Sequence, residues 1–317
     1  MVKLVTSSVV RGAQQGQSHG GVYLIDLENQ MVEQTIDWNT SGIDWQGRGW
    51  DRGLRGIAFD GEQVFIAASD ELFAYTPDFE LIDSWRNPYL KHCHEITVFE
   101  RSLFLTSTGF DSVLGFDLDQ HCFNWGMNIQ PKRIKFKPVG FDPLADDGPL
   151  MLNKMHINNV FCNRHGMYIS GLRTGGMLHF NGSAINMAVE LPAGTHNAQP
   201  FRDGVLFNDS ADDVLRYTGR GEGEEDRSMA VPKYDPNELT HRTAEDEKLA
   251  RPGFARGLCL VSYIVVGGGA TPSTVTLYDV SENTNIGSIQ LSMDVRNAIV
   301  NLQLWTVCQS FNPCNYP

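Results

Sequence analysis

His92-Cys93-His94-Glu95-Ile96 opens a short apolar run, and five other stretches of the chain repeat this arrangement. In each, a His or an Arg stands directly before a segment with strand character: Gly53-Leu54-Arg55-Gly56-Ile57, Lys154-Met155-His156-Ile157-Asn158, Gly194-Thr195-His196-Asn197-Ala198, Phe254-Ala255-Arg256-Gly257-Leu258 and Asp294-Val295-Arg296-Asn297-Ala298. Successive marked residues are 39, 62, 40, 60 and 40 positions apart. A period near 40 with two longer intervals is typical of β-propeller blades.

The repeat that begins at His94 predicts four strands, at 94–99, 101–107, 113–118 and 122–125, with turn-forming residues between them. Four short antiparallel strands make one propeller blade. The other repeats predict strands at 56–59, 63–68, 71–75 and 81–85, at 158–161, 166–170, 177–180 and 185–190, at 198–201, 205–208 and 213–217, and at 258–260, 263–266, 274–279 and 287–291.

The two ends of the chain complement each other. The N-terminus supplies apolar segments at 3–9, 21–27 and 32–38, which fit second, third and fourth strands, whereas 298–305 after Arg296 fits a first strand. A blade shared by both termini would close the ring without leaving a free edge. The sequence therefore predicts an all-β fold, a single six-bladed β-propeller domain over residues 1–317.

Two long insertions, 126–154 and 219–254, follow the fourth-strand positions of their repeats. Loops there would lie on the same face as the marked His and Arg residues. Long loops in compact domains are usually functional lids or disordered segments. We expect both to act as lids, although the second is rich in acidic residues and also fits a solvated surface loop.

Composition narrows the function. A net charge of −13 argues against a nucleic-acid partner, and no apolar run approaches the length of a membrane span. The first residues lack the apolar stretch of a signal peptide, which predicts a cytoplasmic protein, although a mature secreted chain without its leader stays open. The six Cys residues form no CxxC pair, and only Cys308 and Cys314 are close enough in sequence to suggest a disulfide.

The marked residues divide into two groups around the predicted ring. His94, His156 and His196 fall on consecutive repeats, and Arg256, Arg296 and Arg55 on the other three. Three imidazoles that converge from neighbouring strands fit a divalent metal ion (Fe, Mn, Zn or Ca) with open positions for water or substrate. Three guanidiniums beside them would bind a carboxylate, sulfate or phosphate through paired hydrogen bonds.

Other interpretations of these residues stay open. A single His at the start of a strand is often a hydrogen-bonded core residue, and the Arg side chains could join blades through backbone carbonyls. A metal-free anion site or a buried polar network is an alternative to the metal site. Glu95 could be a fourth ligand or a general base, although on a regular strand it would point away from His94.

Several residues would assist at the same face. Asn197 and Asn297 share one offset after the marked residue, and Asn158 lies one step deeper. We expect these amides to line the channel as hydrogen-bond partners. Arg173 and Asp209 lie in loops between second and third strands, which reach the same face, and are predicted to contact the substrate.

The blade period resembles that of six-bladed propeller families such as the gluconolactonase/regucalcin-like proteins and the arylsulfate sulfotransferases. The likeness is one of architecture over nearly the whole chain. The gluconolactonase-like pattern uses acidic and Asn ligands, whereas His94, His156 and His196 stand at these positions here. A three-His channel site is similar to that of the oligogalacturonate lyases and the virginiamycin-type lyases, which have seven blades.

These observations favour a metal-dependent enzyme that acts on a small anionic substrate, most naturally by elimination next to a carboxylate. Arg256, Arg296 and Arg55 would stabilise the developing charge, and Glu95 or a loop Asp would serve as the base. Ester or lactone hydrolysis by metal-bound hydroxide and Fe(II) oxygenation are alternatives. A non-catalytic propeller that binds an anionic sugar or peptide is a third possibility.

Overall fold

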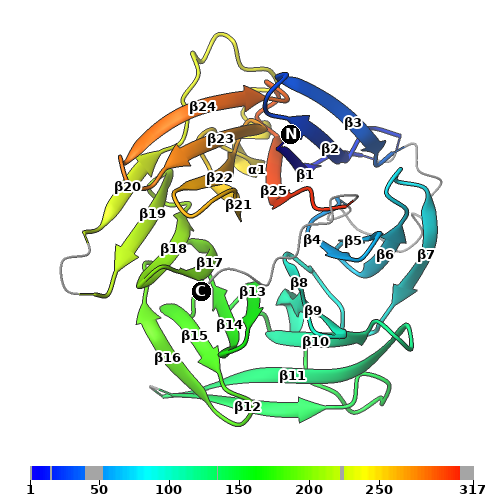
Figure 1. Cartoon of the computed structure of the whole chain (residues 1–317). Helices are drawn as coiled ribbons and strands as arrows, with labels where there is room; N and C mark the ends of the chain where they lie inside the picture. Colours follow the sequence, from blue (N-terminus) through cyan, green and yellow to red (C-terminus); the bar gives the residue numbers. More distant parts are fainter. Residues whose placement is uncertain (1, 15, 40–52, 134, 222–224, 308–317) are drawn as a thin grey trace.

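A computed structural model describes residues 2–14, 16–39, 53–133, 135–221 and 225–307. The fold is all-β, with only two short helical segments in the described residues, η1 (Thr108–Phe110) and α1 (Asp246–Leu249). The strands form five antiparallel sheets that surround a common axis (Figure 1).

Four of the sheets have four strands each. In chain order of their inner strands these are β4 (Ile57–Asp60), β5 (Gln63–Ala67), β6 (Glu71–Tyr75) and β7 (Leu81–Arg86); β17 (Thr195–Phe201), β18 (Gly204–Asp209), β19 (Val214–Gly219) and β20 (Arg227–Ala230); β21 (Arg256–Leu260), β22 (Val265–Ala270), β23 (Thr274–Asp279) and β24 (Thr284–Gln290); and β25 (Asn297–Leu304), β1 (Lys3–Val10), β2 (Gly20–Asp26) and β3 (Met31–Asp37).

The fifth sheet has nine strands and contains two four-strand runs. One run is β8 (Ile96–Phe99), β9 (Ser102–Ser107), β10 (Ser112–Asp117) and β11 (Cys122–Lys132), and the other is β13 (Ile157–Asn163), β14 (Gly166–Gly171), β15 (Gly176–Phe180) and β16 (Ile185–Glu190). Strand β12 (Lys135–Phe141) extends the first run and meets the second through one residue pair, Phe136 with Ile185.

The sheet that both termini share confirms the predicted closure. Strand β25 pairs with β1, for example Leu4 with Leu304, so the last strand of the chain completes the first sheet. The hydroxyl of Ser7 in β1 then donates a hydrogen bond to the carbonyl of Arg55, 2.5 Å away, just before β4. Strand β1 is thus held to the segment before β4 as well as to β25.

The innermost strands define the axis. Strands β4, β8, β13, β17, β21 and β25 each contact the next, and β25 contacts β4, so they form a closed ring (Figure 1). The apolar core lies between neighbouring sheets because each sheet is covered on both faces. Between β4–β7 and β8–β11, for example, Phe65, Leu103, Leu105 and Phe116 are fully buried. Alternate side chains of one strand enter the two interfaces on either side of it.

The first insertion is not the loop that we expected. Residues 126–141 are mostly strand, because β11 continues to Lys132 and turns back as β12. The alternating sequence Lys135-Phe136-Lys137-Pro138-Val139 pairs with β11 and keeps one side of the hairpin polar. Only the segment from 142 to the start of β13 lacks a strand, and a lid over the whole of 126–154 is therefore wrong.

The second insertion also contains a strand that the sequence did not predict. Strand β20 pairs with β19 and completes its sheet, with Met229 buried between exposed neighbours. Such a short strand carries too little apolar periodicity to be recognised alone. The described part of the rest of 219–254 is mainly irregular and includes α1.

Two other sequence expectations concern membranes and cysteines. In the described ranges no helix is long and apolar enough to cross a bilayer. The thiols of Cys93, Cys122, Cys162 and Cys259 are free. The suggested pair Cys308 and Cys314 lies outside the described residues.

Candidate functional site

The marked residues stand at the beginnings of the inner strands. Arg55, His94 and His156 come one or two residues before β4, β8 and β13, His196 is the second residue of β17, and Arg256 is the first of β21. Because these strands form a ring, the side chains come together at one end of the axis. His94, His196 and Arg256 line one space together with Glu95, Asn158, Asn197 and Val300.

A bulge follows the marked residue in three of these strands. The strand register shifts between Ile157 and Asn159, between His196 and Gln199, and between Arg256 and Leu258. A bulge re-aims the side chains beside it. Asn197 has φ 52° and Gly257 has φ 74°, a left-handed conformation that Asn and Gly adopt most readily.

The same hydrogen-bond arrangement orients the imidazoles of His94 and His196. The Nδ1 atom of His94 lies 2.9 Å from the hydroxyl of Thr108, and that of His196 lies 2.8 Å from the hydroxyl of Ser210, in each case fourteen residues later. The hydroxyl of Thr108 donates its own proton to the carbonyl of Ile157 in β13, and that of Ser210 donates to the carbonyl of Ala255 just before β21. Each hydroxyl therefore accepts from an Nδ1–H group, which leaves Nε2 of the imidazole as the acceptor.

His156 is oriented in a different way. Its Nδ1 atom lies 3.0 Å from Oδ1 of Asn153, an acceptor, so Nδ1 carries the proton here too. The backbone before it is fixed by Asp111, whose carboxylate accepts from the N–H groups of Lys154, Met155 and His156 at 2.6–3.0 Å. The rings of His94 and His156 meet edge to face, with 5.4 Å between centroids.

Arg256 joins the two halves of the ring. Its Nη2 donates to Nε2 of His196 at 2.9 Å, and its guanidinium lies 5.1 Å from the centroid of the Phe254 ring. Arg11 and Arg251 lie over the same ring, at 5.0 and 5.4 Å. Arg251 is neutralised by Asp213, but Arg256 forms no ion pair among the residues that the structure describes, and its Nε has no hydrogen-bond partner there.

Burial, and after it this concentration of positive charge, shifts the pKa values of the groups at the site. Burial, followed by Arg55 and Arg256 respectively, holds the pKa values of His94 and His196 well below their usual range. Burial, then Arg173, lowers the pKa of His156 to about 4. Burial also lowers the pKa of Arg55 to about 10 and that of Arg256 well below its normal value. All three imidazoles are therefore neutral at pH 7.

Glu95 points into the channel rather than away from it. Its Oε1 accepts from Nδ2 of Asn197 at 2.6 Å, and its Oε2 accepts from Nδ2 of Asn301 at 2.5 Å. Asn197 in turn accepts from the N–H of Gly257 and from Nδ2 of Asn208. Burial raises the pKa of Glu95 to about 8, although the two amides and the nearby Arg256 lower it. The carboxyl is therefore mainly protonated at neutral pH.

The other predicted substrate contacts serve local roles. Arg296 binds both oxygens of Asp294 and so already has a counter-charge. Asp209 is buried, accepts from the turn that follows it and pairs with Arg216. Arg173 donates to the carbonyls of Asn153 and Lys154, and therefore fixes the segment before His156.

The two remaining predicted amides lie in the channel wall. Nδ2 of Asn158 donates to the carbonyl of Thr195, while its Oδ1 is buried without a partner in the described chain. Oδ1 of Asn297 accepts from the hydroxyl of Ser273. Of these two, only Asn158 lines the space beside His196 and Arg256.

Sequence reasoning missed three kinds of residue at this site. The hydroxyls of Thr108 and Ser210 share an offset of fourteen residues from their His, a regularity that the sequence does contain. Asn301 is a polar residue in the apolar run Ile299-Val300-Asn301-Leu302, which marks a buried amide. Phe254, beneath three guanidiniums, had no sequence signal beyond its place before Arg256.

The fit of a metal ion depends on the Nε2 atoms. All three imidazoles keep Nδ1–H engaged and have Nε2 as the acceptor, as metal-binding His residues do. However, Arg256 occupies Nε2 of His196, and two buried guanidiniums repel a cation. No group of three or more His, Cys, Asp or Glu side chains in the described ranges is arranged to hold a metal ion. The arrangement as it stands does not fit a three-His metal centre, which stays a prediction.

The space between these side chains is small. It measures about 170 Å³, and a water-sized molecule does not fit between the atoms. The side chains of His94, His196 and Arg256 are each at least nine-tenths buried. A ligand group can therefore enter only when a side chain moves. The guanidinium of Arg256 is held by one hydrogen bond in the described chain, to His196.

Comparison with known proteins supports the fold class. No protein-family model matches the chain, and neither does any curated protein. Among solved structures, it is similar to a chain of a nidogen/laminin complex, with a TM-score of 0.57, 10% identity, and coverage of 96% of this chain and 98% of that one. It is also similar to a protein of unknown function from Bacteroides caccae, with a TM-score of 0.55, 9% identity and the same coverage. These likenesses support a β-propeller and show the fold alone.

Proposed function

We propose that the end of the channel around Arg256 binds a small anionic substrate through a carboxylate, sulfate or phosphate group. The observation that carries this proposal is the buried guanidinium of Arg256, which forms no ion pair with any described residue and lies close to Arg11 and Arg55. The neighbouring carboxyl of Glu95 is mainly protonated at neutral pH and does not supply a full counter-charge. Buried charges are normally paired, since an unpaired one is costly. An anionic ligand would supply the missing counter-charge through paired hydrogen bonds.

We propose further that the propeller has six blades, with the nine-stranded sheet counted as two. The support is the closed ring of inner strands and the single residue pair by which β12 meets β16. Six inner strands would then deliver the six marked positions to one end of the axis. The domain would be one propeller with no separate lid domain.

The groups around the anion suit acid–base chemistry. An elimination next to a carboxylate needs a base to remove a proton and a positive charge to stabilise the enolate-like intermediate. The neutral imidazoles of His94 and His156 have Nε2 as an acceptor, and Arg256 would stabilise the charge. Glu95, with a pKa of about 8, lines the same space and can donate or accept a proton. A lyase is therefore the reaction that we favour.

Replacing Arg256 by methionine tests the anion site. We expect the affinity for a small dicarboxylate such as succinate, or for sulfate, to fall about tenfold or more, since a hydrogen bond to a charged group contributes about 1.5–3 kcal/mol. Isothermal titration calorimetry measures this. Arg202→Met, a surface arginine that stacks on Tyr263, is the matched control and should bind like the wild type. Equal affinities of R256M and wild type would refute the proposal.

A metal-dependent lyase or hydrolase is the second candidate. It is favoured by the three imidazoles that keep Nε2 as the acceptor, with His94 and His156 in ring contact. A metal held by His94, His156 and His196 would polarise a substrate oxygen or activate water. Arg256 would then have to leave His196, and the metal would have to overcome the repulsion of the guanidiniums.

Metal content decides between the two candidates. If the second is correct, purified wild type carries close to one equivalent of metal, and His156→Ala loses most of it. Elemental analysis measures the content, and His165→Ala, which changes an exposed His outside the ring, is the control. We expect substoichiometric metal in all three proteins. A stoichiometric metal that is lost only from H156A would replace the anion proposal by the metal-dependent one, while anion binding without turnover would identify a non-catalytic propeller.

A further inference from the structure

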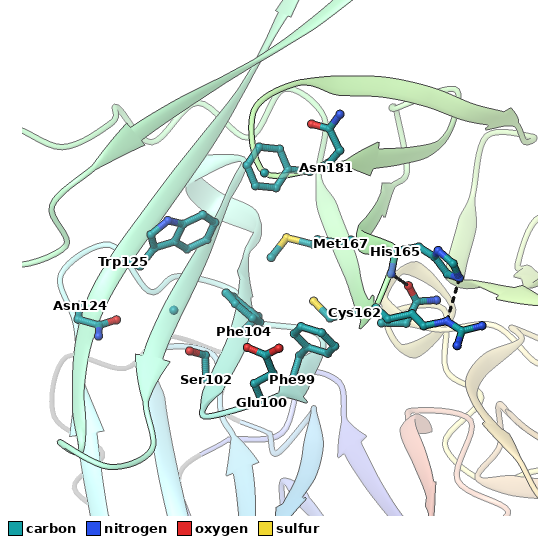
Figure 2. A pocket seen from close by; sticks show the side chains of 16 residues that line it. Phe99, Glu100, Ser102, Phe104, Asn124, Trp125, Cys162, His165, Met167 and Asn181 are labelled. Atoms are coloured by element: carbon teal, nitrogen blue, oxygen red, sulfur yellow. Dashed lines mark hydrogen bonds between the residues drawn. The ribbon is translucent and has the colours of Figure 1, made fainter. Parts of the chain in front are cut away.

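A large cavity in the described part of the protein lies away from the six marked His and Arg positions. It measures about 820 Å³ and opens between the run β8–β11 and the run β13–β16 (Figure 2). Its lining includes the hairpins at 99–102 and 163–166, which follow β8 and β13. Since His94 and His156 precede these same strands, the cavity and the proposed anion site lie at opposite ends of them.

The strand register defines the two walls. Phe104 of β9 is opposite Gly115 of β10, which is opposite Trp125 of β11, so these three share one face of the sheet. Phe99 joins that face through its pairing with Ser102. The facing wall carries Cys162, Met167 and Phe180, which are opposite one another in β13, β14 and β15. Figure 2 shows the Trp125 side of the cavity facing the side of Met167 and Cys162.

This interface is open where the neighbouring one is filled. Between β4–β7 and β8–β11 the aromatic side chains Phe65 and Phe116 are fully buried. Here Phe104, Trp125 and Phe180 are only partly buried, although they belong to the adjoining core. Gly115 has no side chain to fill the space, and a Cβ there would lie 3.1 Å from Cβ of Trp125. The volume falls in the range of small-molecule sites, which are mostly apolar with a few polar groups.

The rim carries one charge of each sign, the carboxylate of Glu100 and the guanidinium of Arg164, so the aromatic walls decide which ligand charge is favoured. Glu100 follows Phe99 directly, in the turn with φ 55°, and its carboxylate faces the cavity beside Phe99 (Figure 2). It forms no ion pair with any residue that the structure describes. Arg164 on the other wall is exposed and donates its Nε–H to His165. Aromatic faces attract cations, and a chain of net charge −13 draws cations toward its surface.

We propose that this cavity binds a small organic cation with an apolar body, such as an aromatic quaternary ammonium compound. The apolar body lies between Phe104 and Trp125 on one wall and Met167 and Phe180 on the other. The cationic group faces the rings and the carboxylate of Glu100. This site is independent of the anion site, because no residue belongs to both.

Calorimetric titration with three probes of similar size tests the proposal: benzyltrimethylammonium, benzyl alcohol and benzoate. We expect the cation to bind at least about fivefold more tightly than the other two, the ratio that a cation–π contact at a partly exposed site provides. Glu100→Gln and Trp125→Leu should each weaken binding of the cation about fivefold. Succinate binding at the Arg256 site should be unchanged in both variants.

Glu62→Gln is the matched control, since Glu62 occupies the corresponding hairpin between β4 and β5 and should leave cation binding unchanged. Circular dichroism and thermal unfolding confirm that each variant is folded. If benzoate binds as tightly as the cation, if E100Q binds the cation like the wild type, or if none of the probes binds, the proposal is wrong. A W125L variant that fails to fold leaves the E100Q comparison as the decisive one.

Discussion

Replacing Asp111 by alanine should lower the free energy of unfolding by about 3–5 kcal/mol, because three hydrogen bonds to one carboxylate are lost together. Asp111 is buried and accepts from the backbone N–H groups of Lys154, Met155 and His156. It also has φ 49°, a left-handed conformation that Asp and Asn tolerate better than Ala. Chemical denaturation of both proteins measures the difference.

Two further variants separate the reasons for this loss. Asp111→Asn keeps the backbone preference and one acceptor oxygen, so it should cost less than D111A. Asp235→Ala removes an exposed carboxylate that accepts from one N–H group, at Asn237, and should cost about 1 kcal/mol. If D111A is no less stable than D235A, the carboxylate does not hold the segment before His156 in solution.

Glu95→Gln should make the protein less sensitive to alkaline pH. Burial raises the pKa of Glu95 to about 8, from 4.5 for an unperturbed carboxyl. Between these values the unfolded chain loses the proton while the folded protein keeps it. The stability from this group is therefore complete below pH 4.5 and is lost as the pH rises toward 8. Relative to E95Q, the wild type should lose about 2–3 kcal/mol between pH 6 and pH 9.

The glutamine variant can keep the hydrogen bonds of the protonated acid. Oδ1 of Asn301 is buried without a partner in the described chain, so rotation of this amide lets it accept from the new side-chain amide. The neighbouring His94, His156 and His196 have pKa values below their usual 6.5 and stay neutral in this window. Denaturant unfolding of the two proteins at pH 6, 7, 8 and 9 gives the comparison. Parallel stability curves would show that Glu95 is ionised in the folded protein at neutral pH.

The strand periodicity and the spacing of the six marked residues were sufficient to predict the propeller and its closure. The N-terminal segments fit the second, third and fourth strands of a blade, and the C-terminal segment fits a first strand. The pairing of β25 with β1 joins them into one sheet. The repeat period and the alternation of apolar residues are local properties of the chain, so they can be recognised without knowing which distant segments are in contact. The hairpin β11–β12 and strand β20 were missed because a short polar strand differs little from a loop in sequence.

The sequence also placed His94, His156, His196, Arg55 and Arg256 at one end of the inner strands. It did not indicate which of the marked residues would be paired. Arg296 is neutralised by Asp294, only two residues away, while Arg256 lies against His196 and Phe254. A side chain's partner depends on rotamers and on bulges, and the bulges after Ile157, His196 and Arg256 re-aim the residues beside them.

By itself, then, the sequence determined the all-β repeat, the register of its His and Arg positions and the joining of the termini, because each follows from periodic local patterns. The tertiary structure alone decided that Glu95 faces inward and keeps its proton, that Arg256 forms no ion pair among the described residues, and that a cavity opens beside Trp125. These depend on which groups burial brings together from distant strands, and no local pattern encodes that.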